Sequence, residues 1–503
     1  MRDPCLPQRF PKRLHLSNPI AGLTRLAARN AVQPHLAHFS RNRHAVAGLT
    51  PNKPASLRNT RLRLTRKLTL AVVMFLFLLA GTSAPIAAQT SAVSPVQVLT
   101  TWYKLYLELV RHTPTYSPPV ASRTFGYIGV TAYEVIATAN PRLATLAGQL
   151  NGFEPGPGRE AGQTYDDAVM LQAALAFAAQ HYFGNTGPTG QRAMTAMTGQ
   201  MARQAAAGVS DDIAKRSADL GLSIAQHVFA WSQTDGGAVV ENMGFPYEYP
   251  LTKGPAHWVP TSLVRQQQLP LLPKWGQNRP FVLKDGAACA LPPPPDYSED
   301  PASAFYQQAL EVVTVQASLN DEQRKIARYW SDDPMLSVTP PGHWLSIALQ
   351  IMKRDNVGIE QSVDVLARLG IAVADGFIGC WNAKYQYDLL RPVTYIRRVM
   401  DPKWEPLLIT PPFPEYPSGH STQSAAAATV LTAFFGDNVA FSDSTMEDDG
   451  LSNRAYPSFW AAAEEAGLSR LYGGIHFRAA IERGLDQGRC IGAAVNALKT
   501  QVK

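Results

Sequence analysis

From Pro95 onward, apolar residues recur at the three- to four-residue spacing of amphipathic helices, and alternating runs of β-branched residues are scarce. In residues 96–112, for example, Val98, Trp102 and Leu109 fall on one stripe. Such stripes must be buried against other helices, so the sequence predicts an all-α protein built from helical bundles. The predicted helices cover residues 96–112, 119–139, 165–183, 190–207, 210–232, 301–318, 321–331, 341–354, 358–383, 419–435, 457–470 and 476–498.

One long stretch, residues 235–300, breaks this helical pattern. Glycine and proline recur through it, and Pro292–Pro295 form a continuous proline run. These residues interrupt helices and strands, so the stretch is predicted to be an ordered loop excursion. We therefore expect an N-terminal helical region (89–234), this Pro/Gly-rich loop region, and a C-terminal helical region that carries the catalytic residues (301–503).

The net charge of +7 is unevenly distributed along the chain. Residues 1–68 contain fourteen Lys or Arg and one acid, whereas the rest contains 32 Lys or Arg and 38 acids. A basic charge that is confined to one terminal segment gives no support for a body that binds nucleic acid. We expect no nucleic-acid partner.

A short apolar run, Leu68–Ala80, separates a basic flank from the small-residue segment GTSAPIAAQTS. The run is shorter than the roughly 20 residues that a membrane-spanning helix needs. This arrangement is typical of a secretory signal peptide, with cleavage near Ala88. Residues 1–88 are therefore predicted to be a basic leader plus signal peptide of an exported bacterial protein, periplasmic or extracellular, without a remaining membrane span. An uncleaved anchor and a buried apolar helix are the alternatives.

Neither the cysteines nor the clustered acids of the body have the spacing of a metal site. Beyond the leader, Cys289, Cys380 and Cys490 allow at most one internal disulfide and one free thiol, and no zinc-like spacing is present. The acidic stretch from Asp443 to Asp449 lacks the spacing of an EF-hand. We predict that it is a solvated loop.

Three other segments place cationic and polar residues in otherwise apolar, small-residue helices. The first contains Lys384 and Arg391, whose seven-residue separation predicts that both lie on one helix face before Pro392 ends or redirects the helix. The last of the three segments along the chain, SRLYGGIH, places Arg470 before His476 and again leads into a helix.

The second segment places Ser418, Gly419 and His420 directly after Pro417. The following residues, through Phe435, are rich in helix formers, so Ser418 and Gly419 are predicted to lie at a helix N-terminus. Free backbone N–H groups and the helix dipole favour an anion at such a position.

Together the three segments offer two Arg, one Lys, a serine hydroxyl, backbone N–H groups and two His. Cations of this kind fit a tetrahedral oxyanion, because the guanidinium fork matches its oxygens. One histidine can ligate or attack the central atom while the other transfers a proton. The aromatic residues beside the motifs are expected to pack the walls of this cage; they are Trp381, Phe413, Tyr416 and Tyr472.

The order K-x6-RP, PSGH and SR-x5-H resembles the three-part signature of the superfamily of type 2 phosphatidic acid phosphatases and vanadium-dependent haloperoxidases. The segments WSDDPMLSVTPPGHW (330–344), PKWGQNRPFVL (273–283) and ASRTFGYIGVTAYEVIA (121–137) are similar to its secreted bacterial haloperoxidase-like branch. The resemblance covers most of the body. It implies a fold of two four-helix-bundle-like halves.

The resemblance also implies a role for each residue of the motifs. Cationic side chains, a serine hydroxyl and a backbone N–H would hold the oxygens of vanadate, or of phosphate in the same site. These groups belong to Lys384, Arg391, Arg470, Ser418 and Gly419. His476 would bind the vanadium. His420, which the resemblance also includes among the cofactor-binding residues, would be the acid–base residue beside the apical oxygen.

The chain departs from the family pattern at one position. Many members carry Asp four residues after the final His, where this chain has Ala480. Because a ligating histidine needs an acceptor that fixes its tautomer, we expect a backbone carbonyl to take this place. Asp332 or Asp333 is expected to orient Arg470, and His343 is a weaker candidate for contact with the site.

The function predicted from this resemblance is a vanadate-dependent peroxidase that oxidises a halide with hydrogen peroxide to hypohalous acid. The alternative is an exported acid phosphatase with a phosphorylated His476. A third possibility is a non-catalytic anion-binding helical protein. The free-energy cost of burying three cations without an anion argues against it. The identity of the halide, a further organic acceptor and the choice between a monomer and a homodimer stay open.

Overall fold

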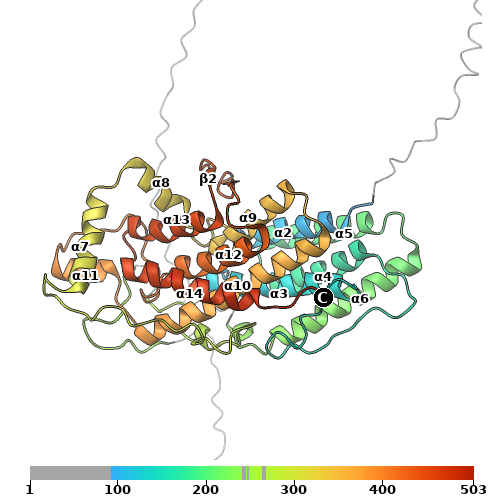
Figure 1. Cartoon of the computed structure of the whole chain (residues 1–503), viewed down its shortest axis with the longest axis horizontal. Coiled ribbons are helices and arrows are strands. Elements are labelled where there is room, and N and C mark those ends of the chain that lie inside the picture. The colour runs from blue at the N-terminus through green and yellow to red at the C-terminus, as the bar shows by residue number, and fades with distance from the viewer. Residues whose placement is uncertain (1–91, 241–244, 246–247, 263–267, 503) are drawn as a thin grey trace, which may run out of the picture. The chain divides into compact units, whose positions relative to one another are not determined.

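The structure is a computed structural model that describes residues 92–240, 245, 248–262 and 268–502 (Figure 1). The predicted leader and signal peptide (1–88) lie outside the described residues. The described part contains thirteen α-helices and a single two-stranded hairpin, so the predicted all-α class is confirmed. None of its helices is long and apolar enough to cross a membrane.

The first five described helices precede the Pro/Gly-rich stretch. They are α2 (Pro95–His112), α3 (Pro118–Ala137), α4 (Asp167–Tyr182), α5 (Pro188–Ala205) and α6 (Asp211–Ser232). Residues 235–300 follow, and their described part forms only the short 3-10 helices η1 (Gly237–Val239) and η3 (Trp275–Gln277).

The remaining elements carry the predicted motifs. They are α7 (Ala304–Ala317), α8 (Asp321–Tyr329), α9 (Thr339–Arg354), α10 (Ile359–Tyr387), α11 (Pro392–Val399), α12 (Gly419–Phe435), β1 (Phe441–Asp443), β2 (Arg454–Tyr456), α13 (Phe459–Tyr472) and α14 (Arg478–Asn496). The strands pair antiparallel, with Phe441 opposite Tyr456. Helix α11 and the hairpin are not among the predicted elements, because both are too short to show a clear period.

Polar residues at the predicted helix starts explain several of these boundaries. Ser94 accepts a hydrogen bond from the backbone N–H of Gln97 and forms a capping box at the start of α2. Ser303, Ser418 and Ser458 accept the equivalent bond at the starts of α7, α12 and α13.

Helix α10 runs past its predicted end at residue 383 but stops before Arg391. Its last helical residue is Tyr387, after which Asp388 takes a left-handed conformation with φ of 47°. Leu390 then donates its backbone N–H to Ala256, and Arg391 is the extended N-cap residue of α11. The expected common helix face for Lys384 and Arg391 is therefore wrong, because the residue before a proline disfavours the helical region and the chain pairs with a loop instead.

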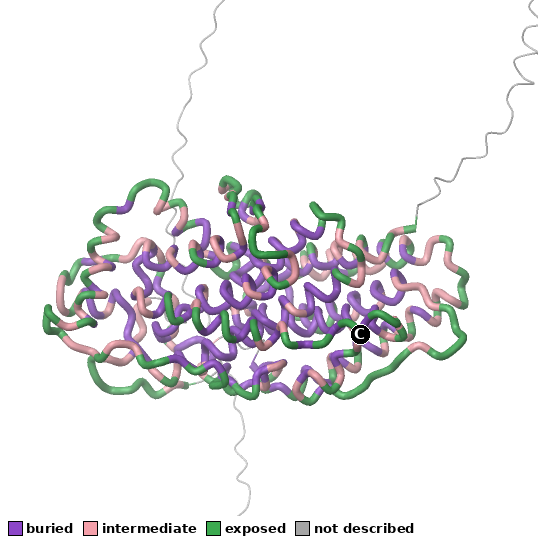
Figure 2. Tube along the Cα trace, in the orientation of Figure 1, coloured by how far each residue is buried: buried purple, intermediate pink, exposed green. Residues whose placement is uncertain are grey.

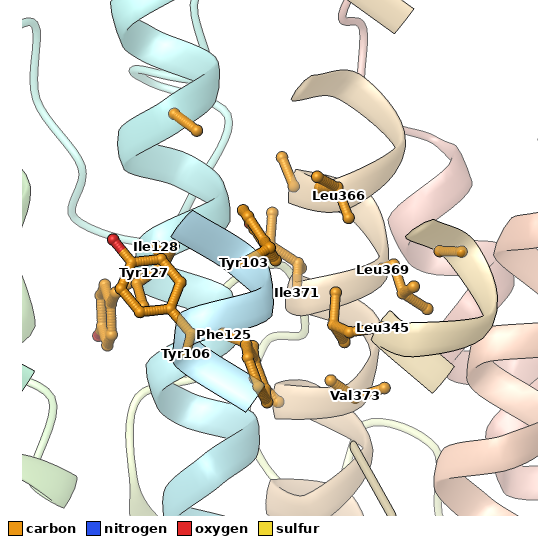
Figure 3. Packing of buried hydrophobic residues seen from close by; sticks show 14 of the residues in the cluster. Tyr103, Tyr106, Phe125, Tyr127, Ile128, Leu345, Leu366, Leu369, Ile371 and Val373 are labelled. Carbon is orange, nitrogen blue, oxygen red and sulfur yellow. The ribbon is translucent and has the colours of Figure 1, made fainter. Parts of the chain in front are cut away.

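Helices α3 and α10 form the centre of the core and are buried along most of their length (Figure 2). Figure 3 shows Tyr103 of α2, Phe125 of α3, Leu345 of α9 and Leu369 of α10 in one cluster. Helix α10 also packs on α12, which in turn packs on α13 and α14. The elements that carry the three motifs are therefore neighbours in space.

Hydrogen bonds and a disulfide tie the Pro/Gly-rich stretch to the helices. The buried carboxylate of Asp375, on α10, accepts backbone N–H bonds from Phe281, Val282 and Leu283 at 2.7, 2.9 and 3.2 Å. A disulfide joins Cys289 to Cys490 of α14. Cys380 is a buried free thiol. The three described cysteines therefore form one disulfide and leave one free thiol, the maximum that their number allows.

Candidate active site

The three predicted motifs meet at the ends of α10, α12 and α13 and in the turn before α14. Arg391 Nη1 lies 3.1 Å from His476 Nε2, and Arg470 Nη1 lies 3.0 Å from His420 Nε2. Lys384 Nζ lies 2.5 Å from the carbonyl oxygen of Pro417, directly before the second motif. Residues up to 92 positions apart in the sequence thus form one group.

Arg391 is fully buried and is held by backbone carbonyls. Its Nε donates to Phe413 and its Nη1 to Ile475, both at 2.9 Å. Its remaining nitrogen, Nη2, is buried without a hydrogen-bond partner among the described residues. Burial lowers the pKa of Arg391 to about 10, so the side chain is still cationic at neutral pH.

Arg470 presents a second incompletely bonded guanidinium group. Its Nη1 contacts the ring of His420, whereas Nε and Nη2 are buried without a partner among the described residues. Burial lowers its pKa to about 10 as well. Buried donors are normally hydrogen-bonded, so the three unpaired nitrogens of Arg391 and Arg470 indicate a site for an acceptor that carries several oxygens.

The ring of His476 is fixed by a carboxylate. Its Nδ1 lies 2.9 Å from Glu415 Oε1, and the same oxygen accepts the backbone N–H of Phe477 at 2.8 Å. Nδ1 therefore carries the proton, and the lone pair of Nε2 points toward Arg391. Burial and, next, Arg391 lower the pKa of His476 well below its usual value. The ring is neutral, as a metal ligand must be.

Glu415 corrects the expected acceptor for His476. The partner is a side-chain carboxylate and not a backbone carbonyl, because the turn before α14 packs against residues 413–416. Burial raises the pKa of Glu415 to about 7, although Arg391 and Lys384 oppose this shift. An acid between Pro414 and Tyr416, in an apolar segment beside the second motif, was the signal in the sequence that could have identified it.

Lys384 donates three hydrogen bonds to the loop before α12. Its Nζ donates to the carbonyl oxygens of Pro414, Glu415 and Pro417 at 2.8, 2.9 and 2.5 Å. Burial lowers the pKa of Lys384 to about 7. The ring of Phe413 lies within 5.1 Å of Nζ and forms one wall of the cage. An anion can bind this ammonium only in exchange for one of the carbonyls.

Ser418 and Gly419 begin α12 as the sequence predicts. Ser418 Oγ accepts the backbone N–H of Ser421 at 3.3 Å, which leaves its own O–H available as a donor. The backbone N–H of Ser418 donates to the carbonyl of Ala480 at 2.9 Å. Ala480 occupies the position that carries Asp in many family members. Its backbone carbonyl thus holds the second motif against α14.

The expected carboxylate partner of Arg470 has a further role. Neither Asp332 nor Asp333 forms an ion pair with Arg470, although both carboxylates interact with its charge at longer range, so the expected partnership holds without a direct contact. Asp332 is buried, and its Oδ1 is instead bonded to His343 Nδ1 at 2.9 Å. Its Oδ2 lies 3.7 Å from His420 Nε2. Burial and Arg470 lower the pKa of His420 to about 4, so this ring is neutral and able to accept a proton.

His343 does not contact the predicted cage directly. Its Nε2 lies 2.7 Å from Asp443 Oδ2, and both side chains are fully buried. The prediction that the acidic stretch is solvated is therefore wrong for Asp443, which the hairpin turns inward onto α9. Glu447 and Asp448 are exposed as expected. The described residues contain no cluster of metal-ligating side chains.

The charge on His343 should make a measurable contribution to stability. Burial opposes that charge, but Asp332 and Asp443 outweigh it and raise the pKa of His343 to about 10. The stabilisation is then complete below the usual pKa of 6.5 and is lost as the pH rises through about 10. Urea unfolding of the wild type and of His343→Gln should show a stability difference that shrinks between these pH values. A difference that stays constant with pH would show a neutral His343.

Comparisons with known proteins agree with this arrangement. The family model described as the VCPO second helical-bundle domain matches residues 364–403 and 397–502. The crystal structure of a bacterial vanadium-dependent iodoperoxidase is similar over 81% of this chain and 97% of its own, with 36% identity and a TM-score of 0.73. The holo form of a bacterial vanadium-dependent chloroperoxidase is 16% identical over 81% of this chain and 93% of its own, with a TM-score of 0.59, and shows the fold alone. No curated protein sequence matches the chain.

The helical fold, the buried cationic cage and these similarities define an enzyme of the vanadium haloperoxidase type. The chain belongs to the vanadium-dependent haloperoxidase family.

Proposed function

We propose that this haloperoxidase holds vanadate in the cage formed by Arg391, Arg470 and His476 and that iodide is its preferred halide. The observation that carries the vanadate site is the set of three buried guanidinium nitrogens that have no partner among the described residues, on two arginines that contact His476 and His420 through their Nη1 atoms. The choice of iodide is supported by the 36% identity to the bacterial iodoperoxidase over 97% of that chain.

The residues fit a multiply charged oxyanion. Arg391, Arg470 and Lys384 supply positive charge, and Glu415 offsets only part of it. Arg391 Nη2 together with Arg470 Nε and Nη2 would bind anion oxygens, and the O–H of Ser418 and the N–H of Gly419 would add donors at the start of α12. Glu415 fixes the proton on Nδ1, so the lone pair of His476 Nε2, which accepts from Arg391 Nη1 at 3.1 Å in this structure, would bind vanadium in exchange for that contact.

Bound vanadate would supply Lewis-acid activation of hydrogen peroxide toward attack by a halide. The residues of the chain would do the rest. His420 is neutral and would accept the proton of incoming peroxide at the ring nitrogen that carries no hydrogen. Arg391 and Arg470 stabilise negative charge on oxygen in a water-poor site, because both are buried. Lys384 keeps the loop of residues 414–417 closed over His476.

We also propose that the protein is exported. The disulfide between Cys289 and Cys490 supports this proposal, because such bonds persist in oxidising compartments and are rare in the cytosol. The charge pattern of the leader and the short apolar run at 68–80 point the same way.

The decisive test is to load the purified apo-protein with orthovanadate and to supply hydrogen peroxide with iodide, bromide or chloride. We expect vanadate-dependent halide oxidation that is fastest with iodide. The unfolding free energy should rise with vanadate concentration, by about 2.7 kcal/mol at one hundred times the dissociation constant.

The control for this test is His476→Ala, which should lose both the oxidation and the vanadate-dependent stabilisation. Hydrolysis of p-nitrophenyl phosphate should be measured in parallel. Phosphatase activity that vanadate only inhibits, with no halide oxidation, would instead support the acid phosphatase alternative.

A further inference from the structure

A buried ionic chain lies behind His420 and has no part in the cage itself. It consists of Asp332, His343 of α9 and Asp443 of β1, and all three are at most 1% exposed. Both ring nitrogens of His343 face carboxylate oxygens, at 2.9 Å for Asp332 and 2.7 Å for Asp443. Because a carboxylate only accepts, both nitrogens must donate, so His343 is an imidazolium between two anions.

The far end of this chain is firmly held. Asp443 Oδ1 accepts the backbone N–H of Thr445 at 2.9 Å. The ring of Trp330 stacks on His343 at a centroid distance of 4.4 Å, and its Nε1 donates to Glu465 at 3.0 Å. His343 therefore cannot turn to another partner, and its Nδ1 fixes where Asp332 Oδ1 lies.

The near end of the chain is open toward the cage. Asp332 Oδ2 is buried and has no hydrogen bond among the described residues, and besides His343 its one ion-pair contact is His420 Nε2 at 3.7 Å. The backbone that carries Asp332 is strained, because Asp332, Met335 and Thr339 all have positive φ, of 49°, 66° and 64°. A cluster that served only stability would have no reason to leave a buried carboxylate oxygen unpaired, or to hold it by a strained loop.

We propose that His343 and Asp443 are positioning residues for halide oxidation, which act through Asp332 to set the orientation of the His420 ring. His343 holds one oxygen of Asp332, so that the other oxygen is presented to His420 Nε2. With its hydrogen on Nε2, His420 would accept the proton of peroxide at Nδ1, once Arg470 Nη1, which lies 3.2 Å from Nδ1 and 3.0 Å from Nε2, donates to the anion instead. The inference rests on the proposed acid–base role of His420.

The test compares His343→Gln and Asp443→Asn with the wild type. Asp443→Asn keeps the shape and one acceptor oxygen, so it remains informative if His343→Gln folds poorly. The matched control is Asp364→Asn, which removes a charge from another ion pair of the core, with Arg368 on α10. It should lower the melting temperature without affecting the site.

Two readouts separate positioning from stability. The dissociation constant of the apo-protein for orthovanadate, measured by calorimetry, should rise about 10- to 100-fold in both test variants, as for other residues that orient ligand-binding side chains. In the vanadate-loaded enzymes, kcat for iodide should fall and its pH profile should shift, while Asp364→Asn keeps the wild-type profile and affinity.

Test variants that lose melting temperature but keep the wild-type vanadate affinity and pH profile would overturn the inference. His420→Ala distinguishes this outcome from a failure of the proposed function. If His420→Ala retains kcat, the acid–base role of His420 is wrong, and the positioning of its ring has no consequence for the reaction.

Discussion

Replacing Glu415 with alanine should remove vanadate binding and destabilise the folded apo-protein by about 3–5 kcal/mol, the usual cost of leaving a buried charge without its partner. Glu415 is fully buried and, within the part of the chain that the structure describes, is the one carboxylate that contacts His476. Its loss leaves Arg391 and Lys384 without their negative neighbour and frees the Nδ1 proton of His476. Urea unfolding and calorimetry with orthovanadate measure the two effects.

Glu415→Gln separates the charge of this residue from its shape. The amide oxygen can still accept from His476 Nδ1 and from the backbone N–H of Phe477, so most of the stability should be retained. The neutral acceptor makes His476 a weaker ligand, and vanadate affinity should fall about 10- to 100-fold. Wild-type affinity in Glu415→Gln would show that the carboxylate charge does not tune His476. Glu405→Gln, at an exposed ion pair with Arg397, is the control and should change neither quantity.

Lys384→Met should be the second strongly destabilising substitution, with a loss of about 3 kcal/mol or more. Methionine fills a similar volume but leaves the carbonyls of Pro414, Glu415 and Pro417 buried without their donor. Each such carbonyl costs about 1–3 kcal/mol. The three carbonyl contacts require the ammonium form of Lys384, because a neutral amine has only two N–H donors and would leave one of these carbonyls without a partner. Chemical unfolding of the apo-protein measures the loss.

The same variant tests how Lys384 serves the site. If its main task is to hold the loop, vanadate affinity and stability should fall together in Lys384→Met. Lys403→Met, at an exposed position, should match the wild type in both measurements. A stable Lys384→Met that has lost only vanadate binding would show that the ammonium binds the anion directly and leaves the carbonyls when it does so.

The sequence predicted most helices because their apolar periods are long, and it located the cage because the three motifs are specific in order and spacing. It missed the partners of those motifs. Glu415 and His343 become meaningful only when distant segments pack, since the turn before α14 reaches residues 413–416 and the hairpin brings Asp443 onto α9. Such contacts depend on tertiary geometry, which local periodicity does not encode.

The end of α10 shows a related limit. A seven-residue separation fits two helical turns, yet the backbone leaves the helix at Asp388 because Leu389 and Leu390 pair with the loop around His257. Propensity and spacing gave no sign of that pairing. The consequence is that Lys384 and Arg391 approach the cage from two different elements, which sequence spacing alone could not distinguish from one helix face.

Helices α12 and α14 meet along a line of glycines, and this contact determines which parts of the site can move. A Cβ atom on Gly488 would lie 2.1 Å from the carbonyl oxygen of Thr422, and one on Gly484 would lie 2.9 Å from that of Ser418. The two helices approach closely at these glycines, and Thr422 Oγ1 also donates to Gln487 Oε1 at 3.2 Å, so the packing restricts sliding or rotation of α14 past α12. The histidine side and the serine side of the cage therefore behave as one rigid body. Movements that admit an anion, peroxide or a halide therefore have to come from elements other than α12 and α14.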